Sequence, residues 1–474
     1  MSPIANVALG KHIHLVGIGG SGLAAIALVL LDEGYQVSGS DQQASSMTEL
    51  LAARGARVAI GHHEDNVKGA DLIVVSSAVP QDNPEIIAAR AQGIPVVKRA
   101  ELLGRMMQGR RGVAVAGTHG KTTTTGMIAQ ILLEAGLDPT FIVGGVIASL
   151  GTNARAGTGP FVIEADEYDR TFLGLQPWAA VVTNVEYDHP DCYPTFEAMF
   201  GAFGEFVDLL PDDGVLIACR DNPAARELGE LQSRQGKSVV MYGLDDDALW
   251  RAVDIQPNNA GGNDYVLLRG GQTVGLVRLR VPGLHNVVNS LAALAVSDQL
   301  GVSFSQAHDA LAAFRGVLRR FEIKGEASGV TVVDDYGHHP SEIKATLAAA
   351  RTRFPGRKVW AVFQPHTYSR VKALLGDFAQ AFAEADHVIV TAIYASRERD
   401  TLGVSSADIV ARMIGRHRDV RLIESLDEAA SYLKSNVKAG EVVITLSAGD
   451  GNRVGEHLLE ELRRRPINGK ASEQ

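Results

Sequence analysis

The segment GTHGKT at residues 117–122 has the residue types and the spacing of a phosphate-binding loop. It follows the apolar run VAVA and precedes the helical pattern TTTGMIAQILLEAG, which is the setting such a loop requires. Its backbone N–H groups can hold phosphates, Lys121 can neutralise the β and γ groups, and the Thr122 hydroxyl can bind Mg²⁺. Val115 stands where the full pattern has its first glycine, so the loop is a shortened form, and a structural turn is the alternative. We predict that ATP contacts Gly117, Thr118, His119, Gly120, Lys121, Thr122 and Thr123.

Two acidic segments follow later strands. EADEYD at residues 164–169 comes directly after FVI, and its four carboxylates repel one another unless a cation lies among them. Mg²⁺ beside a triphosphate is such a cation, whereas a solvated acidic loop is the alternative. In VEYDHPD at residues 185–191, His189 lies between Asp188 and Asp191. It is either a second metal ligand or an imidazole satisfied in the core.

A second glycine-rich loop, GIGGSG at residues 17–22, follows the apolar run HIHLV and opens a helical pattern. Such glycines let the backbone approach a diphosphate at a helix N-terminus. Asp41 ends the next predicted strand 19 residues after Gly22, where its carboxylate can accept a ribose hydroxyl. A tight packing turn is the alternative. The predicted diphosphate site consists of Gly17, Gly19, Gly20, Ser21, Gly22 and Asp41.

Further polar residues stand at predicted helix starts and strand ends. Asn286 opens a helix predicted over residues 286–300 and is either an N-cap or a ligand contact. Arg320 either belongs to a solvated linker or reaches a γ-phosphate when domains close. DDYGHHP at residues 334–340 and FQPHTYSR at residues 363–370 end strands, where open α/β sheets hold ligands. Arg370 can bind a substrate carboxylate or form a surface salt bridge.

The elements that must position these residues follow a βα rhythm. Three times a short apolar run is followed by a polar or glycine turn and a longer helical pattern, which is typical of parallel sheets. At roughly 150 residues per domain, 474 residues give about three domains. The predicted fold class is α/β. It comprises an N-terminal doubly wound, Rossmann-like domain (1–109), a central P-loop ATPase domain (110–320) and a C-terminal Rossmann-like domain (321–474).

Composition excludes several function classes. With 45 Lys and Arg against 55 Asp and Glu, the net charge is −10, so no global field attracts nucleic acid or anionic lipid. The two cysteines form no C-x-x-C pair, which indicates neither a disulfide framework nor a cysteine zinc site. No apolar run approaches roughly 18 residues, and the first twenty residues resemble a buried strand more than a signal peptide. We expect a cytoplasmic protein with no nucleic-acid or membrane partner.

The ordered motifs GTHGKTTT, EADEYDRTFL, TNVEYDHPD, GLHNVVNSLAA, RRFE, DDYGHHPSEI and FQPHTYSR resemble those of the Mur ligases of peptidoglycan synthesis. The resemblance covers about residues 10–465. It implies an ATP-dependent ligase that joins L-alanine to the lactyl carboxylate of UDP-N-acetylmuramate through an acyl phosphate, with ATP and Mg²⁺ as cofactors. It further implies that the first domain binds the UDP-sugar, the central domain ATP and the third domain the amino acid.

The resemblance also implies roles for single residues. The implied catalytic residues are Lys121, His189, Arg320 and His338, and the implied metal ligands are Thr122, Glu164 and His189. In addition to the loop at residues 117–123, Asn286, Asn289, Arg320 and Asp335 are implied to bind ATP. The amino acid is implied to bind His338, His366 and Arg370. The glycine loop at residues 17–22 then holds the UDP-sugar rather than a nicotinamide cofactor. A monomer or a homodimer is expected.

This sequence departs from the family pattern at Thr367, a position that is often arginine in the alanine-adding branch, and at Tyr168, where serine is frequent. No lysine lies between His189 and Lys237, so the carbamylated lysine of the later Mur ligases has no counterpart. The main alternative is a recycling ligase that adds the tripeptide L-Ala-γ-D-Glu-diaminopimelate to the same UDP-sugar. A non-catalytic nucleotide-binding protein and an oxidoreductase using the glycine loop are two further alternatives.

Overall fold

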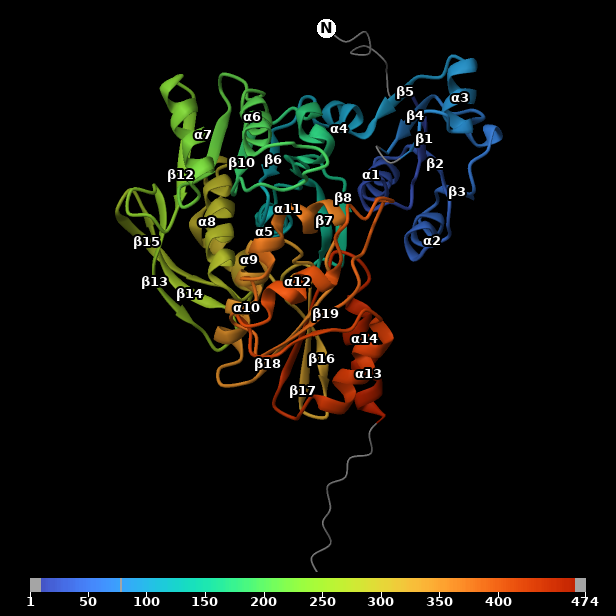
Figure 1. The fold of residues 1–474 in the computed structure, drawn as a ribbon. Helices are drawn as coiled ribbons and strands as arrows, with labels where there is room; N and C mark the ends of the chain where they lie inside the picture. Colours follow the sequence, from blue (N-terminus) through green and yellow to red (C-terminus); the bar gives the residue numbers. More distant parts are fainter. Residues whose placement is uncertain (1–9, 77–78, 465–474) are drawn as a thin grey trace, which may run out of the picture.

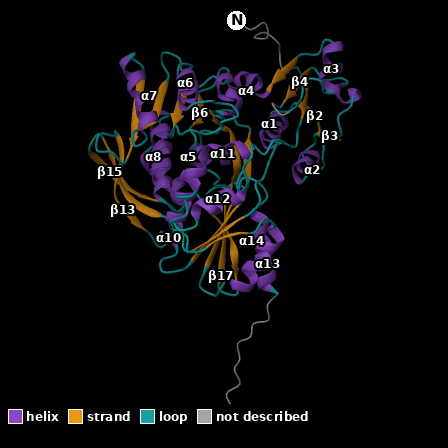
Figure 2. Ribbon diagram, in the orientation of Figure 1, coloured by secondary structure: helices purple, strands orange, loops and turns teal. Residues whose placement is uncertain are grey.

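A computed structural model describes residues 10–76 and 79–464, and they form three β-sheets that follow one another along the chain (Figure 1). The outer ends of the first and third predicted domains, residues 1–9 and 465–474, lie outside the described residues. Helices flank each of the sheets (Figure 2). The predicted three-part α/β fold is therefore confirmed.

The N-terminal sheet has five parallel strands in the order β3-β2-β1-β4-β5, a doubly wound arrangement. Its short apolar strands are typical of parallel sheets covered on both faces. Its elements are β1 (His12–Val16), α1 (Ser21–Asp32), β2 (Gln36–Asp41), α2 (Ser46–Ala53), β3 (Arg57–Ile60), η1 (Glu64–Val67), β4 (Leu72–Val75), α3 (Pro84–Ala91), β5 (Val96–Lys98) and α4 (Arg99–Met107).

The central sheet has ten strands in the order β15-β14-β13-β12-β11-β10-β6-β9-β7-β8, with antiparallel pairs at both edges. The polar, glycine-spaced stretch at residues 242–281 contains β13, β14 and β15, which form one edge of this sheet. The elements are β6 (Gly112–Ala116), α5 (Lys121–Glu134), β7 (Thr140–Ile147), β8 (Thr152–Arg155), β9 (Phe161–Glu164), η2 (Tyr168–Gly174), β10 (Ala179–Val182), α6 (Phe196–Val207), β11 (Val215–Cys219), α7 (Pro223–Arg234), β12 (Ser238–Gly243), β13 (Trp250–Pro257), β14 (Asn263–Arg269), β15 (Gln272–Arg278), α8 (Leu284–Gln299) and α9 (Phe304–Ala313).

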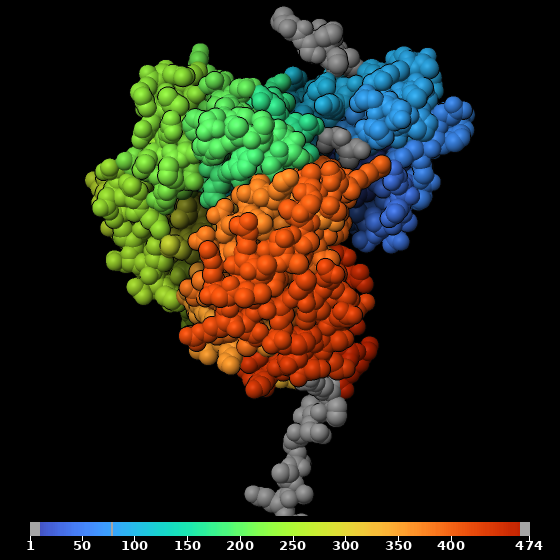
Figure 3. All heavy atoms as spheres, in the orientation of Figure 1, coloured from blue at the N-terminus to red at the C-terminus, as the bar shows by residue number. Residues whose placement is uncertain are grey.

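The C-terminal sheet has six strands in the order β16-β17-β21-β18-β19-β20, of which only β16 runs antiparallel to its neighbour. This part of the chain, orange to red in Figure 3, lies against the green central part. Its elements are β16 (Glu322–Ala327), β17 (Val330–Asp335), α10 (Pro340–Arg353), β18 (Val359–Phe363), α11 (Tyr368–Phe378), β19 (His387–Val390), α12 (Ser406–Met413), β20 (Val420–Leu422), α13 (Leu426–Asn436), β21 (Val442–Leu446) and α14 (Asn452–Arg463).

The first two sheets share a hydrophobic core. One cluster of buried side chains runs from Ile13 in β1 to Val317, just after the central domain's last helix. Helix α1 joins the two parts because it contacts β2 on one side and β7 and β8 on the other. All residues of α1 from Leu23 to Leu30 are buried, as expected of a helix that is apolar all round. The C-terminal sheet has clusters of its own on its two faces.

Among the described residues, no helix combines the length and the apolar composition needed to cross a bilayer.

Candidate active site

The predicted phosphate-binding loop at residues 117–122, called the phosphate loop below, lies between β6 and α5, as its sequence predicts. Gly120 caps α5 with φ +82°, a backbone conformation that favours glycine. The Lys121 amine donates to the Gly117 carbonyl at 2.5 Å and to the Thr118 carbonyl at 3.1 Å, and it lies 2.9 Å from the Glu167 carboxylate. Burial acts to lower the pKa of Lys121, but the carboxylates of Glu167 and Glu164 outweigh it and raise the pKa. The loop therefore holds a firmly protonated amine.

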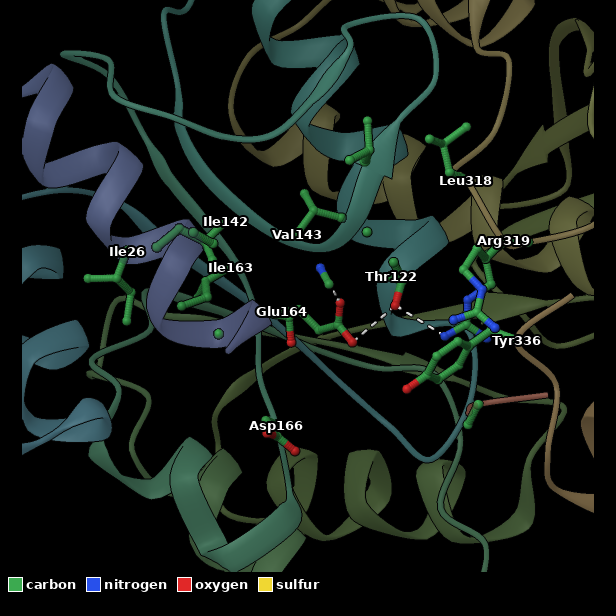
Figure 4. Close-up of a pocket in the computed structure, with 18 of the residues that line it drawn as sticks. Ile26, Thr122, Ile142, Val143, Ile163, Glu164, Asp166, Leu318, Arg319 and Tyr336 are labelled. Carbon is green, nitrogen blue, oxygen red and sulfur yellow. Dashed lines mark hydrogen bonds between the residues drawn. The ribbon is translucent and has the colours of Figure 1, made fainter. Parts of the chain in front are cut away.

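Thr122 and Glu164 form an oxygen-rich pair beside the loop (Figure 4). The Thr122 hydroxyl donates to the Glu164 carboxylate at 3.1 Å, and the Gly144 N–H donates to the other carboxylate oxygen at 2.8 Å. The Arg320 guanidinium approaches the same hydroxyl at 3.4 Å. Hydroxyl and carboxylate oxygens are ligands that Mg²⁺ accepts, so two of the three predicted metal ligands fit that ion.

The third predicted metal ligand, His189, lies near the carboxylates of Glu167 and Asp188 rather than near that of Glu164. Its Nε2 is 3.6 Å from Glu167 and 3.7 Å from Asp188. Burial acts to lower the pKa of His189, whereas Asp188 and Glu167 raise it, with a net increase. Glu167 thus bridges His189 and Lys121. Glu167 belongs to the acidic motif, but its spacing along the chain does not distinguish it from the neighbouring carboxylates.

The N-terminal glycine loop takes the predicted strand-to-helix position before α1. The Gly19 N–H donates to the Asp41 carboxylate at 2.9 Å, so Asp41 supports the loop directly. A Cβ at Gly22 would lie 2.1 Å from the Arg99 guanidinium, which shows how closely this cation approaches the loop. Arg99 also pairs with Asp166 at 2.8 Å. No sequence signal identified Arg99 as a site residue.

One cavity of about 750 Å³ extends across all three parts of the chain. Ser21 and Gly22 line it from the glycine loop, Thr122 and Glu164 from the central domain, and Tyr336 from the end of β17. Figure 4 shows Glu164 and Thr122 facing each other, with Ile26, Ile142 and Ile163 to one side and Arg319 and Tyr336 to the other.

A smaller cavity, of about 200 Å³, gathers the residues predicted to bind the rest of ATP. Its lining includes His119, Gly120, Thr122, Thr123, Asn286, Asn289, Arg320 and Asp335. Burial raises the pKa of Asp335 to about 6, although Arg320 and two backbone N–H groups oppose the increase. Arg320 lines both cavities, so it lies between them.

The three residues predicted to bind an amino acid lie together. The rings of His338 and His366 have centroids 5.5 Å apart, and Arg370 donates to His366 Nδ1 at 3.0 Å. The Arg370 guanidinium is nevertheless 3% exposed and pairs with Asp188 at 2.8 Å. This ion pair links α11 to the central domain. The sequence suggested either a substrate ligand or a surface salt bridge for Arg370, and a buried pair between domains is neither.

Glu342, on α10, is a further residue that sequence reasoning missed. Its carboxylate lies 3.4 Å from both His119 and Arg320 and accepts from the backbone N–H groups of His338 and His339 at 3.0 and 3.2 Å. The spacing of a helix-capping glutamate three residues after His339 was the available signal. It indicates the cap but not the contact with the phosphate loop.

The three sheets and the cavities between them define a three-domain α/β protein. Family models match in the same order. "Mur ligase family, catalytic domain" matches residues 12–111, "Mur ligase middle domain" residues 115–297, and "Mur ligase, glutamate ligase domain" residues 319–449. The chain belongs to the Mur ligase family, as the ordered motifs indicate.

Similar proteins cover nearly the whole chain. UDP-N-acetylmuramate–L-alanine ligase of Caldanaerobacter subterraneus subsp. tengcongensis is 45% identical, over 95% of this chain and 98% of the relative. The ligase of the same name from Burkholderia multivorans is 45% identical, over 95% and 98%. The crystal structure of UDP-N-acetylmuramate-alanine ligase from Thermotoga maritima has a TM-score of 0.80 at 30% identity, over 95% and 98%. A murein peptide ligase from Psychrobacter arcticus has a TM-score of 0.71 at 28% identity, over 96% and 100%.

Proposed function

We propose that this protein is an ATP-dependent ligase that joins L-alanine to the lactyl carboxylate of UDP-N-acetylmuramate in peptidoglycan precursor synthesis. The observation that carries this proposal is the cavity that joins the glycine loop, the Thr122–Glu164 pair and Tyr336. A long substrate held at the glycine loop can present its carboxylate to ATP at the phosphate loop. Full-length similarity to alanine ligases supports L-alanine over the tripeptide alternative.

In this proposal, each of the three domains binds one substrate. Residues 1–109 bind the UDP-sugar through Gly17, Gly19, Gly20, Ser21, Gly22 and Asp41. Residues 110–320 bind ATP, and residues 321–474 bring the amino acid to His338, His366 and Arg370. A cytoplasmic location is part of the proposal, and the free cysteines Cys192 and Cys219 are compatible with a reducing compartment.

In the first step, a lactyl carboxylate oxygen attacks the γ-phosphorus of ATP, and ADP leaves. Lys121 and Arg320 offset the charge that spreads over the transferred group, and the phosphate loop fixes its position. Thr122 and Glu164 would hold Mg²⁺, which supplies further neutralising charge when bound. The product is an acyl phosphate, whose phosphate is a far better leaving group than a carboxylate oxygen.

In the second step, the α-amine of alanine attacks the acyl carbon, and inorganic phosphate leaves. His338 can take up the proton that the amine loses as the C–N bond forms. Burial and the nearby Arg370 hold the pKa of His338 well below 6.5, so the imidazole is neutral at pH 7. Its Nδ1–H donates to the Tyr336 carbonyl at 3.0 Å, which leaves Nε2 as the proton acceptor.

The test is phosphate release from ATP with UDP-N-acetylmuramate, comparing L-alanine, glycine, L-serine and the L-Ala-γ-D-Glu-diaminopimelate tripeptide, with product mass as readout. We expect turnover with L-alanine and a product one alanyl residue heavier. Lys121→Ala should reduce the rate by about 10²–10³-fold, the cost of removing one preorganised cation or donor. Lys237→Ala is the matched control, because the Lys237 amine pairs with the exposed Asp212 carboxylate, far along the chain from the loop. Turnover with tripeptide alone would assign the recycling reaction instead.

A further inference from the structure

Three side chains that can bind a metal meet where the central and C-terminal parts of the chain face each other. His119 lies in the phosphate loop, Glu186 follows β10, and His339 caps the start of α10. One ligand atom from each residue lies within 4.8 Å of the other two. Within residues 10–76 and 79–464, no other group of three or more His, Cys, Asp or Glu side chains meets this condition. We call this group the His–Glu–His cluster.

The spacing of the cluster suits a tetrahedral ion. Donor atoms bound to one Zn²⁺ at about 2.1 Å lie roughly 3.4 Å from each other. His119 Nε2 is 3.3 Å from the Glu186 carboxylate oxygen Oε2, and His339 Nδ1 is 3.8 Å from the same oxygen. The two imidazole rings have centroids 4.6 Å apart. Small side-chain movements therefore suffice to place all three ligands around one ion.

The surroundings orient the ligands as metal sites do. His119 Nδ1 faces the Glu342 carboxylate at 3.4 Å, so this carboxylate can hold the Nδ1–H when Nε2 gives up its proton to bind a metal ion. A carboxylate behind a histidine is a common second partner in metal sites, where it fixes the ring and increases its basicity. The Ser341 hydroxyl donates to Glu186 Oε2 at 2.5 Å and holds that carboxylate in place. Two carboxylates around one imidazole also favour a cation here.

His339 gives a second, independent indication. The residue is 5% exposed, and its Nε2 has no hydrogen-bond partner among the described residues. Its Nδ1 accepts only from the Ser341 N–H, at 3.3 Å. Buried polar atoms are normally satisfied, and an unsatisfied one is costly. The Nδ1 atom that faces Glu186 accepts one long hydrogen bond, so a metal ion bound there would compete with that bond alone among the described residues.

We propose that His119, Glu186 and His339 form a binding site for a divalent transition-metal ion such as Zn²⁺. Two imidazoles and one carboxylate are a ligand set that Zn²⁺ favours, whereas Mg²⁺ prefers oxygen ligands such as the Thr122–Glu164 pair. The site is distinct from that pair and goes beyond the ligase function. His119 lines the smaller cavity, so the fourth coordination position is accessible from there.

A metal in this site has a structural consequence. It joins the phosphate loop and the segment after β10, both in the central domain, to the start of α10 in the C-terminal domain. Zn²⁺ bound to the folded protein should therefore raise its melting temperature, since the ion binds an arrangement that unfolding destroys. Because His119 also belongs to the predicted ATP contacts, Zn²⁺ should compete with or weaken nucleotide binding.

The experiment is a titration of the full chain with Zn²⁺ and with Co²⁺ in a large excess of Mg²⁺, which occupies the oxygen-rich pair. We expect one Zn²⁺ per chain by competition with a chromophoric chelator, and visible Co²⁺ absorption of the tetrahedral type. His339→Gln should weaken Zn²⁺ binding by about 100-fold or more, since altering even an outer partner of a metal ligand costs about 10–100-fold. Glu186→Gln should do the same, so the result does not depend on one variant folding.

Two control variants separate this site from others. His308→Gln removes a histidine that lies 3.0 Å from the exposed Asp309 carboxylate on α9, and it should leave Zn²⁺ binding unchanged. Glu164→Gln alters the predicted Mg²⁺ pair and should also leave Zn²⁺ binding unchanged. The proposal is overturned if the chain retains no Zn²⁺ in excess Mg²⁺. It is equally overturned if folded His339→Gln and Glu186→Gln proteins bind Zn²⁺ as tightly as the unaltered chain.

Discussion

Glu85, on α3, is a carboxylate with no exposed surface in the N-terminal domain. It accepts from the Ser40 hydroxyl at 2.6 Å and from the Asn66 amide at 2.5 Å, and His14 Nε2 lies 3.7 Å away. Burial acts to raise its pKa, but these contacts outweigh burial and lower the pKa from 4.5 to about 2. Glu85 therefore stabilises the folded state in its charged form.

This depressed pKa predicts a pH dependence of stability. The folded state releases the Glu85 proton more readily than the unfolded state does, so the stabilisation is present above pH 4.5 and is lost as the pH falls toward 2. Its full size is about 3 kcal/mol, from 1.36 kcal/mol per pKa unit. In urea unfolding across this pH range, Glu85→Gln should therefore lose less stability than the unaltered chain. Ser40→Ala, which removes one donor, should move the loss to higher pH. Parallel pH profiles of Glu85→Gln and the unaltered chain would contradict this assignment.

The buried ion pair of Arg370 and Asp188 predicts a stability effect at a position where the sequence suggests substrate binding. Arg370→Met leaves the Asp188 carboxylate, 4% exposed, without its main partner, at a cost of about 3–5 kcal/mol. The double variant with Asp188→Asn should recover part of this loss in calorimetry, because no unpaired charge remains. If Arg370→Met only raises KM for L-alanine and leaves the melting temperature unchanged, the ion pair with Asp188 does not stabilise the folded protein.

At this scale, sequence predicts what is local. Lys121 and Thr122 belong to one short segment, and the structure places both at the start of α5, directly after Gly120. Glu342 contacts His119 across more than two hundred residues of sequence, and Asp188 meets Arg370 across a similar separation. Such contacts depend on how the sheets pack against each other, and neither composition nor spacing along the chain specifies that packing.

At the scale of elements, a helical glycine marks the contact between α4 and η2. A Cβ added to Gly104 would lie 2.2 Å from the Gly174 carbonyl oxygen, a backbone atom that cannot move aside without shifting the segment. Gly104→Ala should therefore lower the free energy of unfolding by about 1–3 kcal/mol. Gly201→Ala in α6 is the matched control, since nothing lies within 4 Å of its added Cβ. It should raise stability by about 0.4–1 kcal/mol in denaturant unfolding. Equal effects at both positions would show that the Gly104 contact is loose.

Periodicity predicts most elements but not their neighbours in a sheet. The run SGLAAIALVLLD has no polar face, and the glycine loop before it indicates a helix. That α1 is buried from both sides becomes clear only when it lies between β2 and the β7–β8 pair. Likewise, the stretch at residues 242–281 is strand-like in sequence, yet its antiparallel addition to a parallel sheet depends on pairing that no local pattern specifies.

At the scale of the whole molecule, the number of sheets and the number of cores differ. The sequence predicts three modules, and three sheets are present, but one large buried cluster spans the N-terminal and central sheets, and the N-terminal sheet adds only a small cluster of its own. The C-terminal sheet has its own clusters. Because cooperative unfolding follows shared packing, we infer two unfolding units. One contains both the glycine loop and the phosphate loop, and the other contains the predicted amino-acid site.

Hydrogen exchange can test this inference with one core substitution in each unit. Ile26 in α1 is fully buried and lines the large cavity with Ile142 and Ile163 of the central sheet. Ile26→Ala should cost about 2–5 kcal/mol and speed backbone exchange in β1–β5 and in β7–β9 together. Leu347→Ala, equally buried in α10, is the matched control and should speed exchange in β16–β21 alone. If Ile26→Ala affects only β1–β5, the first two sheets unfold separately, and their shared core does not couple the sugar-nucleotide loop to the ATP loop.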